Sequence, residues 1–368
     1  MSAGSTYGNI FRITTWGESH GKGIGVVVDG CPAGLPLCGA DIQPFLDRRR
    51  PGQSSFSTQR SEADAVTILS GTFEGRTTGT PISLMVENKD QNSKDYSELA
   101  DCYRPGHADF CFDRKYGFRD YRGGGRSSGR ETIGRVAGGA IAAKVLSAMG
   151  IQLLAYTKSI GPFSIDLSRF DAEEIWRNAL FMPDATTARA ASDYLKKCMQ
   201  ENNSTGGICE CVVTGLPAGL GDPVFEKLDA NLAKAVFSIG AVKGFEIGDG
   251  FETAFATGLS NNDSFYSEDG SIKKRTNHSG GTLGGMSDGS PLVLRAAFKP
   301  TPSIASGQQT VGRDGKEVSL RIRGRHDPVI VPRAVVVVEA MTAITLLDAL
   351  LANMTARMEG VLDFYRRS

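Results

Sequence analysis

The side chains best suited to move protons near neutral pH are four histidines: His20, His107, His278 and His326. They occur in the motifs GESHG, RPGHAD, NHSGG and GRHDP, always beside glycine, arginine or aspartate. Such polar surroundings favour general acid–base chemistry, although a surface position is the simpler interpretation of any single one. A zinc site is a further alternative, but no pair has the short ligand spacing of zinc sites, so we expect no metal.

Segment 104–131 concentrates groups that bind anions. Its cations are Arg104, Arg114, Lys115, Arg119, Arg122, Arg126 and Arg130. Glycines 123–125 allow close backbone approach, Ser127 and Ser128 add hydroxyls, and Glu131 opens a predicted helix whose N-terminus favours anions. Guanidinium groups, backbone N–H groups and hydroxyls together predict a phosphate site built without a metal.

Two other interpretations of this segment remain: a solvated basic loop and an RGG-type contact with nucleic acid. The 41 basic and 41 acidic residues give zero net charge, which disfavours nucleic acid as a partner. The usual nucleotide motifs are also absent. The 17–23 loop lacks the spacing of a P-loop, and glycines 21, 23 and 25 do not match G-x-G-x-x-G.

Three other segments place cations next to rigid turns: 47–52 (DRRRPG), 299–303 (KPTPS) and 325–327 (RHD). The cations of the first could instead interact with the C-terminus of the predicted helix that they end. In the third, Asp327 precedes Pro328, which disfavours helix and indicates a turn. All three have the composition of ligand-binding loops.

The predicted helices and strands, which must position these residues, do not alternate one by one along the sequence. Predicted strands are 9–15, 25–29, 65–70, 82–86, 151–160, 208–214, 292–298 and 318–323. Predicted helices are 40–50, 131–149, 172–179, 187–202, 224–239 and 332–354. Strands arrive in pairs and no linker divides the chain, so we expect a single α+β domain over 1–368 with antiparallel sheets. Asp222 and Pro223 would start the fifth helix, and Gly150 would end the second.

The bulk properties favour a cytoplasmic protein without a membrane segment. No uninterrupted apolar run approaches the ~18 residues of a membrane helix, and the most apolar stretch, 334–354, is interrupted by polar residues and indicates a buried helix. No signal peptide is evident at the N-terminus. The seven cysteines include no C-x-x-C pair; Cys209 and Cys211 would share one face of a strand as structural thiols.

GESHG, DGCPAGLPL, RPGHAD, KYGFRDYRGGGRSS and GRHDP resemble, in order and spacing, the signatures of the chorismate synthase family. The resemblance covers about residues 11–341. It implies a homotetrameric α+β enzyme with a β-α-β sandwich core and central helices. The implied reaction is an anti 1,4-elimination that converts 5-enolpyruvylshikimate 3-phosphate to chorismate and phosphate, the last common step of the shikimate pathway. It requires reduced FMN without net redox change, because the flavin lends an electron and takes it back.

The resemblance also implies roles for residues. His107 resembles the histidine that protonates departing phosphate, His20 the one that protonates the flavin, and Asp327 the carboxylate that works with the flavin in removing the ring proton. The implied substrate-binding residues are Arg49, Arg104, Arg130 and Arg325. The implied flavin-binding residues are Arg126, Ser127, Ser128, Gly240, Ala241, Gly284, Lys299, Pro300, Thr301, Pro302, Ser303 and Arg325.

The sequence departs from the family's pattern at three places. Gly240 replaces an asparagine, which puts a side-chain contact to flavin in doubt. Ser55 replaces a basic residue sometimes assigned to a pyridine nucleotide (NADP), and Gly129 replaces alanine. The compact length favours reliance on an external flavin reductase or a supply of reduced flavin. Two rival interpretations are an enzyme for another phosphorylated acid and a non-catalytic flavin- or RNA-binding protein.

Overall fold

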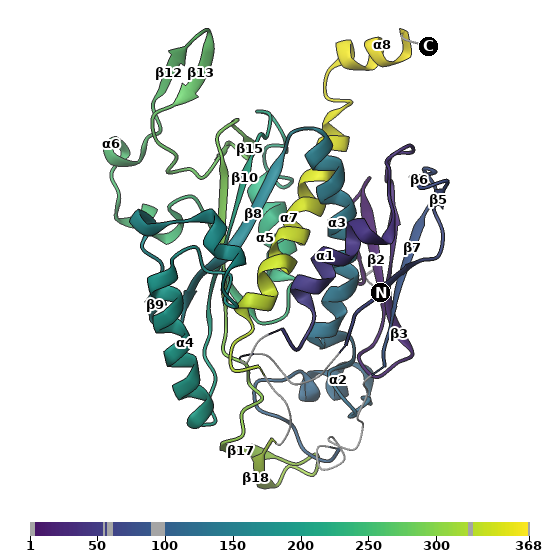
Figure 1. Ribbon diagram of the computed structural model, residues 1–368, viewed down its shortest axis with the longest axis vertical. Helices are drawn as coiled ribbons and strands as arrows, with labels where there is room; N and C mark the ends of the chain where they lie inside the picture. The colour runs from purple at the N-terminus through teal and green to yellow at the C-terminus, as the bar shows by residue number, and fades with distance from the viewer. Residues whose placement is uncertain (1–3, 54–55, 57–61, 90–99, 323–326, 367–368) are drawn as a thin grey trace.

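The fold is a sandwich of two antiparallel sheets around central helices (Figure 1). The computed structural model describes residues 4–53, 56, 62–89, 100–322 and 327–366. The first sheet has the order β1 (Thr6–Tyr7), β2 (Arg12–Gly17), β3 (Gly23–Asp29), β7 (Ile82–Glu87), β4 (Val66–Ile68). The second has the order β11 (Val242–Ile247), β16 (Leu292–Phe298), β10 (Gly207–Thr214), β8 (Gln152–Ile160), β9 (Phe163–Ser164).

The helices between the sheets are α1 (Gly39–Arg49), α3 (Thr132–Ala148), α5 (Leu228–Phe237) and α7 (Val331–Asn353). α3 packs on the first sheet, α7 on the second, and the two helices pack on each other. One apolar cluster runs through both sheets and these helices, which supports the single-domain interpretation. The α+β class with antiparallel sheets is confirmed.

Shorter elements surround this core. The helices are α2 (Asp109–Tyr116), α4 (Ala185–Gln200), α6 (Gly258–Asn261) and α8 (Met358–Arg366). The 3₁₀ turns are η2 (Gly125–Ser127), η3 (Gly129–Glu131), η4 (Leu167–Arg169), η5 (Ala172–Trp176) and η6 (Gly250–Phe255). The hairpins are β5–β6 (Thr72–Phe73, Arg76–Thr77), β12–β13 (Phe265–Glu268, Ser271–Lys274), β14–β15 (Thr282–Leu283, Met286–Ser287) and β17–β18 (Gly307–Val311, Glu317–Arg321).

α7 is the apolar helix expected over 334–354, and it lies at the centre of the molecule (Figure 1). Its length and mean hydropathy of 2.1 would suffice to cross a membrane, but 78% of its most apolar window is buried inside the protein. A helix that is apolar all round needs such cover, and here α1, α3, α5 and the second sheet provide it. α7 therefore belongs to the core.

Glycines let α3 approach its neighbours. A Cβ added at Gly139 would lie 2.3 Å from the Cβ of Ala340 on α7. We expect Gly139→Ala to lower the free energy of unfolding by about 1–3 kcal/mol or more, because α3 and α7 must separate to accommodate the methyl group. Urea unfolding would measure the loss, and an unchanged midpoint would contradict this account of the packing.

Most predicted elements are confirmed, with ends that differ by up to three residues. Gly150 ends α3 as expected, with φ +77° and its N–H donating to the carbonyl of Ser147. The predicted start of the fifth helix at 222–224 is wrong, because Val224 has a φ of +71° and α5 begins at Leu228. The predicted helix 172–179 is instead the 3₁₀ turn η5, which ends at Trp176. Cys209 and Cys211 are buried in β10, where burial raises the pKa of both thiols.

Candidate active site

The predicted site segments gather at one end of the sandwich, the lower end in Figure 1, near α2 and β17–β18. α3 and α7 begin at this end, and β16 finishes there. Residues 101–104 are tied to the β17–β18 hairpin, since the N–H of Tyr103 donates to the carbonyl of Val311 at 3.1 Å. Loops far apart in the sequence thus meet around the first turns of two buried helices.

In the motif RPGHAD, the arginine and the aspartate bond to each other and fix the shape of the loop. Arg104 donates from Nε and Nη2 to the two carboxylate oxygens of Asp109, at 2.8 and 2.7 Å, and its backbone N–H adds a third bond. Burial alone would raise the pKa of Asp109, but the bonds from Arg104 outweigh it and hold that pKa below its usual value. This largely buried pair fixes the loop that carries His107.

His107 links this loop to the KPTPS segment. Its Nδ1 lies 2.9 Å from the carbonyl of Pro105, which can only accept, so Nδ1 carries a proton there. Its Nε2 lies 2.7 Å from the hydroxyl of Ser303, and Lys299 Nζ donates to the carbonyl of Gly106 at 2.8 Å. The structure therefore brings a candidate proton donor beside residues predicted to bind the cofactor.

His20 lies against the glycine-rich loop. Its Nδ1 is 3.0 Å from the hydroxyl of Ser19, and a Cβ added at Gly123 would lie 2.4 Å from its ring. The amide of Asn88 donates to the carbonyls of Glu18 and Gly21, both at 2.9 Å, and holds the GESHG turn in place. The two motifs around glycines 17–25 and 123–125 are thus one packed unit.

We expect Gly123→Ala to lower turnover at least tenfold, since the added methyl group must displace the His20 ring. The melting temperature should hardly change, because Gly123 and His20 lie in loops at one end of the fold, outside the apolar core. Gly129→Ala is the matched control: its Cβ meets nothing within 4 Å, so activity should persist. Equal turnover in both variants, measured at saturating reduced FMN, would show that the position of His20 is unimportant.

The RGGGRSS segment contains the 3₁₀ turn η2, and the turn η3 follows it directly in front of α3. Arg126 donates from Nη1 to the carbonyl of Gly17 at 3.0 Å and from Nη2 to the Thr15 hydroxyl at 2.6 Å. The hydroxyl of Ser128 accepts from the N–H of Arg130 at 3.3 Å. Arg126 therefore fixes the loop to β2, while the N–H groups of Ser127 and Ser128 donate to carbonyls within the loop itself.

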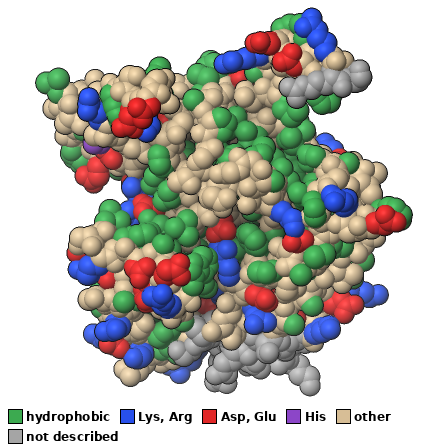
Figure 2. Space-filling model, turned by 45° about the horizontal axis from the view of Figure 1, so that its top comes forward, with side chains coloured by type: hydrophobic (Ala, Val, Ile, Leu, Met, Phe, Trp, Pro, Cys, Tyr) green, Lys and Arg blue, Asp and Glu red, His purple; other side chains and the backbone are tan. Residues whose placement is uncertain are grey.

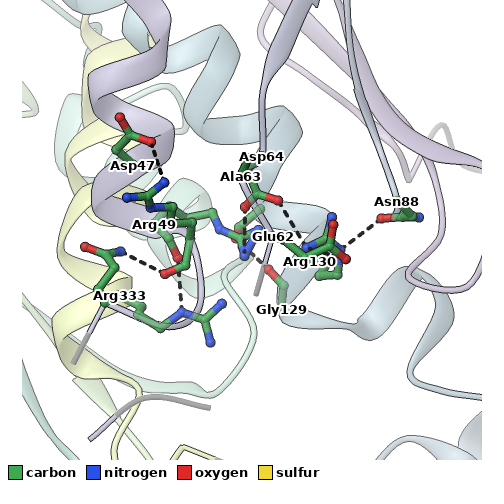
Figure 3. Close-up of polar contacts among 12 residues, drawn as sticks. Asp47, Arg49, Glu62, Ala63, Asp64, Asn88, Gly129, Arg130 and Arg333 are labelled. Atoms are coloured by element: carbon green, nitrogen blue, oxygen red, sulfur yellow. Dashed lines mark hydrogen bonds and ion pairs between the residues drawn. The ribbon is translucent and has the colours of Figure 1, made fainter. Parts of the chain in front are cut away.

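Arg49 and Arg130 converge on Asp64, as Figure 3 shows. Arg130 Nη1 lies 3.2 Å from Asp64 Oδ1, and Arg49 Nη2 lies 3.7 Å from Asp64 Oδ2. Arg130 Nε also donates to the side chain of Asn88 at 3.0 Å, which connects this cluster to the His20 turn. The two arginines come from α1 and from the start of α3, so the site joins both central helices.

The guanidinium of Arg49 is buried and incompletely satisfied. Its residue is 1% exposed, and none of its three side-chain nitrogens has a hydrogen-bond partner among the residues that the structure describes. Burial lowers the pKa of Arg49 to about 9. A buried charge without hydrogen bonds is costly, and the Asp64 carboxylate at 3.7 Å compensates it only in part.

Asp327 lies at the same end, in front of α7. Arg333 Nη1 donates to its Oδ2 at 2.5 Å, and Arg333 Nε donates to the backbone carbonyl of Arg49 at 3.0 Å. The carbonyl of the next residue, Pro328, accepts from the N–H of Thr205 at 2.9 Å. Ser204 in turn donates to the carbonyl of Thr301, two residues before the His107 partner Ser303, at 2.7 Å. A short path of contacts thus connects Asp327 with His107.

Not all predicted site residues can be placed together. Arg325, His326 and Ser55 lie outside the described residues. Ala241 lies beside Lys299, whose N–H donates to its carbonyl at 2.9 Å, but Gly284 lies in the β14–β15 turn at the far end of β16. Seven residues of strand separate these ends by about 20 Å. Gly284 is therefore not near the other predicted flavin residues within this chain.

Asp64, Asn88 and Arg333 also belong to this site, although the sequence did not predict them. Asp64 and Asn88 flank short strands of the first sheet, a position at which a polar residue is unremarkable by composition. Arg333 carries a signal that could have been used, because it is the one charged residue between Pro328 and Glu339. Among the described residues, no group of three or more His, Cys, Asp and Glu side chains could hold a metal.

The fold and the site define an α+β protein in which basic loops and two histidines meet at one end of a sandwich of two sheets. A family profile described as chorismate synthase matches residues 11–351. The chorismate synthase of Agathobacter rectalis is 70% identical over 99% of this chain and 100% of its own, and that of Lachnospira eligens is 64% identical over the same shares. A crystal structure of chorismate synthase matches with a TM-score of 0.75 at 32% identity, over 98% of each chain. The chain belongs to the chorismate synthase family, which confirms the expected family and enzyme class.

Proposed function

We propose that this protein converts 5-enolpyruvylshikimate 3-phosphate to chorismate and phosphate by anti 1,4-elimination with reduced FMN. The observation that carries the proposal is the buried, unsatisfied guanidinium of Arg49 beside Arg130, at the end of the fold that also holds His107 and Asp327. The substrate has one phosphate and two carboxylates. Closely spaced arginines suit such an anion because each guanidinium can bind two oxygens at once.

In this proposal, different side chains bind the substrate and transfer its protons. Arg49 and Arg130, with Arg104 and Arg325, bind and orient the anionic groups. In its doubly protonated form, His107 donates the proton on Nε2, the ring nitrogen next to Ser303, to the departing phosphate and keeps the proton on Nδ1. Asp327, held at one oxygen by Arg333, accepts the ring proton. Acid and base on different loops suit an elimination in which the two leaving groups depart from separate carbons.

The residues predicted to bind FMN fit a phosphorylated, polar ligand. The hydroxyl of Thr301 is buried and has no partner among the described residues, and Lys299 and Ser303 lie next to it in the chain. Arg126, Ser127 and Ser128 lie in and between the 3₁₀ turns just before α3, where a bound flavin would compete with the contacts that these residues make within the protein. Reduced FMN would supply the electron density that helps phosphate leave, and His20 would hold a proton at its ring. The assignment of Gly284 rests on the resemblance alone.

Assembly and location are also part of the proposal. Hydrophobic side chains gather in several patches on the surface in Figure 2. Phe255 and Leu259, near α6, are 84% and 99% exposed, and α8 exposes Met358, Phe364 and Tyr365. Exposed apolar patches of this kind usually mark protein interfaces, which supports a homotetramer. We propose a cytoplasmic enzyme that depends on an external reductase for its flavin.

Anaerobic turnover tests the function. The purified protein is incubated with dithionite-reduced FMN and either enolpyruvylshikimate phosphate or shikimate 3-phosphate, and phosphate and chorismate are measured. We expect equal release of both products from the first compound only. Phosphate release from another phosphorylated acid instead would favour a different enzyme on the same scaffold. Activity with oxidised FMN and NADPH would contradict dependence on an external reductase.

A further inference from the structure

Arg333 connects three parts of the site. It lies in the first turn of α7, and its side chain reaches Asp327 through Nη1 and the last carbonyl of α1 through Nε. The side chains of Arg333 and Asp327 are 22% and 10% exposed, so the pair is mostly shielded from water. Figure 3 shows the contact between Arg333 and the backbone of Arg49.

We propose that Arg333 is a positioning residue that fixes the carboxylate of Asp327 for proton removal. This inference rests on the proposed function, in which Asp327 is the base. Arg333 acts by holding Oδ2 of Asp327, which sets the direction of the other oxygen on the same carbon. An error of about 1 Å in the position of a reacting group can cost 10²-fold in rate.

Guanidinium geometry explains why an arginine is used. Nε and Nη1 point in different directions within one rigid plane, so a single side chain holds two acceptors at a fixed angle. One acceptor, the carbonyl of Arg49, ends α1 and lacks a partner within its own helix. The guanidinium is thereby anchored to a rigid element while its other nitrogen holds Asp327. A lysine ammonium could hold either acceptor but not define the angle between them.

The competing explanation is that Arg333 only joins α1 to α7. Another ion pair provides a matched control for that role. Arg48, next to Arg49 on α1, pairs with Glu339 on α7 and donates from Nη1 to its Oε1 at 3.1 Å. This pair bridges the same two helices without a contact to Asp327. Loss of Arg48 should therefore lower stability but leave the chemistry intact.

A double-mutant cycle tests the proposal in the full-length holoenzyme. We compare wild type, Arg333→Met, Asp327→Asn and the double variant by anaerobic kcat and KM, with Arg333→Lys and Arg48→Met alongside. We expect Arg333→Met to lower kcat by about 10–10² while KM changes less than about threefold. In the Asp327→Asn background the same change should cost less than about threefold, because its target is gone. Arg333→Lys should recover part of the loss, and Arg48→Met should lower the melting temperature but keep kcat within about twofold.

Three results would overturn the inference. Equal losses of kcat from Arg333→Met in both backgrounds would show that it does not act through Asp327. Equal losses of kcat from Arg333→Met and Arg48→Met would show that Arg333 only joins α1 to α7. Wild-type protein that releases no phosphate from enolpyruvylshikimate phosphate would refute the proposed function itself, and the inference with it. Melting curves and flavin titration of every variant separate misfolding from a change in chemistry.

Discussion

Replacement of His107 by alanine is expected to lower kcat by about 10²–10⁴, the usual range for loss of one general acid. His107 has its Nδ1 at the carbonyl of Pro105 and its Nε2 beside the hydroxyl of Ser303. This geometry fixes the ring, with Nδ1 towards the carbonyl of Pro105 and Nε2 towards the predicted cofactor loop. The departing phosphate then lacks a proton donor in the variant. Anaerobic steady-state kinetics at saturating reduced FMN would measure the effect.

His278 provides the control for this experiment. It is also paired, with its Nδ1 2.6 Å from Asp249, but it lies near the start of β16, at the other end of the sandwich from His107. His278→Ala should keep kcat within about twofold. Near-normal turnover of His107→Ala, with both variants folded, would remove His107 from the chemistry.

Arg49→Met is expected to weaken substrate binding by at least about 10–10² without loss of stability. The affinity falls because hydrogen bonds to a charged group contribute about 1.5–3 kcal/mol each. Stability should change little, since the variant removes a buried charge without hydrogen bonds but also removes the contact of that charge with Asp64 Oδ2 at 3.7 Å. Asp64 keeps its contact with Arg130 at 3.2 Å, so no carboxylate loses its last partner. Equilibrium binding and thermal melting would be measured together.

Arg50, the next residue, is the matched control for Arg49. Its side chain is 43% exposed and forms an ion pair at 3.5 Å with Asp47, which lies in the last turn of α1. Arg50→Met should therefore change neither substrate affinity nor melting temperature by much, since exposed pairs contribute roughly 0–1 kcal/mol. If Arg49→Met destabilised the protein strongly and left affinity intact, Arg49 would be a structural residue.

The sequence predicted the parts of the fold that depend on apolar periodicity. Apolar runs in the sequence predicted β16 and α7, and the ends of both elements were predicted within one residue. The predicted strand 318–323 corresponds to β18, but β11 and β17 were missed, because short strands rich in glycine and polar residues carry little pattern. The start of α5 was misplaced because the backbone of Val224 is left-handed, which is rare for a β-branched residue and invisible in composition.

The sequence predicted most of the residues of the site, but it did not predict which of them lie close together in the fold. Arg49 and Asp64 are buried together, although an exposed helix C-terminus was an equally good interpretation of the arginines. Asp64 adopts a φ of +45°, which no local pattern indicates. The path from Asp327 through Thr205 to the His107 loop depends on loop contacts between distant segments. Such contacts are set by the packed core, which positions the loop ends.

The central claim is that one substrate lies between His107 and Asp327 and is held by Arg49 and Arg130. An anaerobic crystal structure with enolpyruvylshikimate phosphate and FMN tests it most directly. We predict the phosphate within hydrogen-bond distance of His107 Nε2, the ring carbon that loses its proton facing Asp327, and a substrate oxygen on Arg49. The account would be contradicted if the substrate were bound elsewhere, or if other residues separated His107 from Asp327 so that one substrate could not contact both.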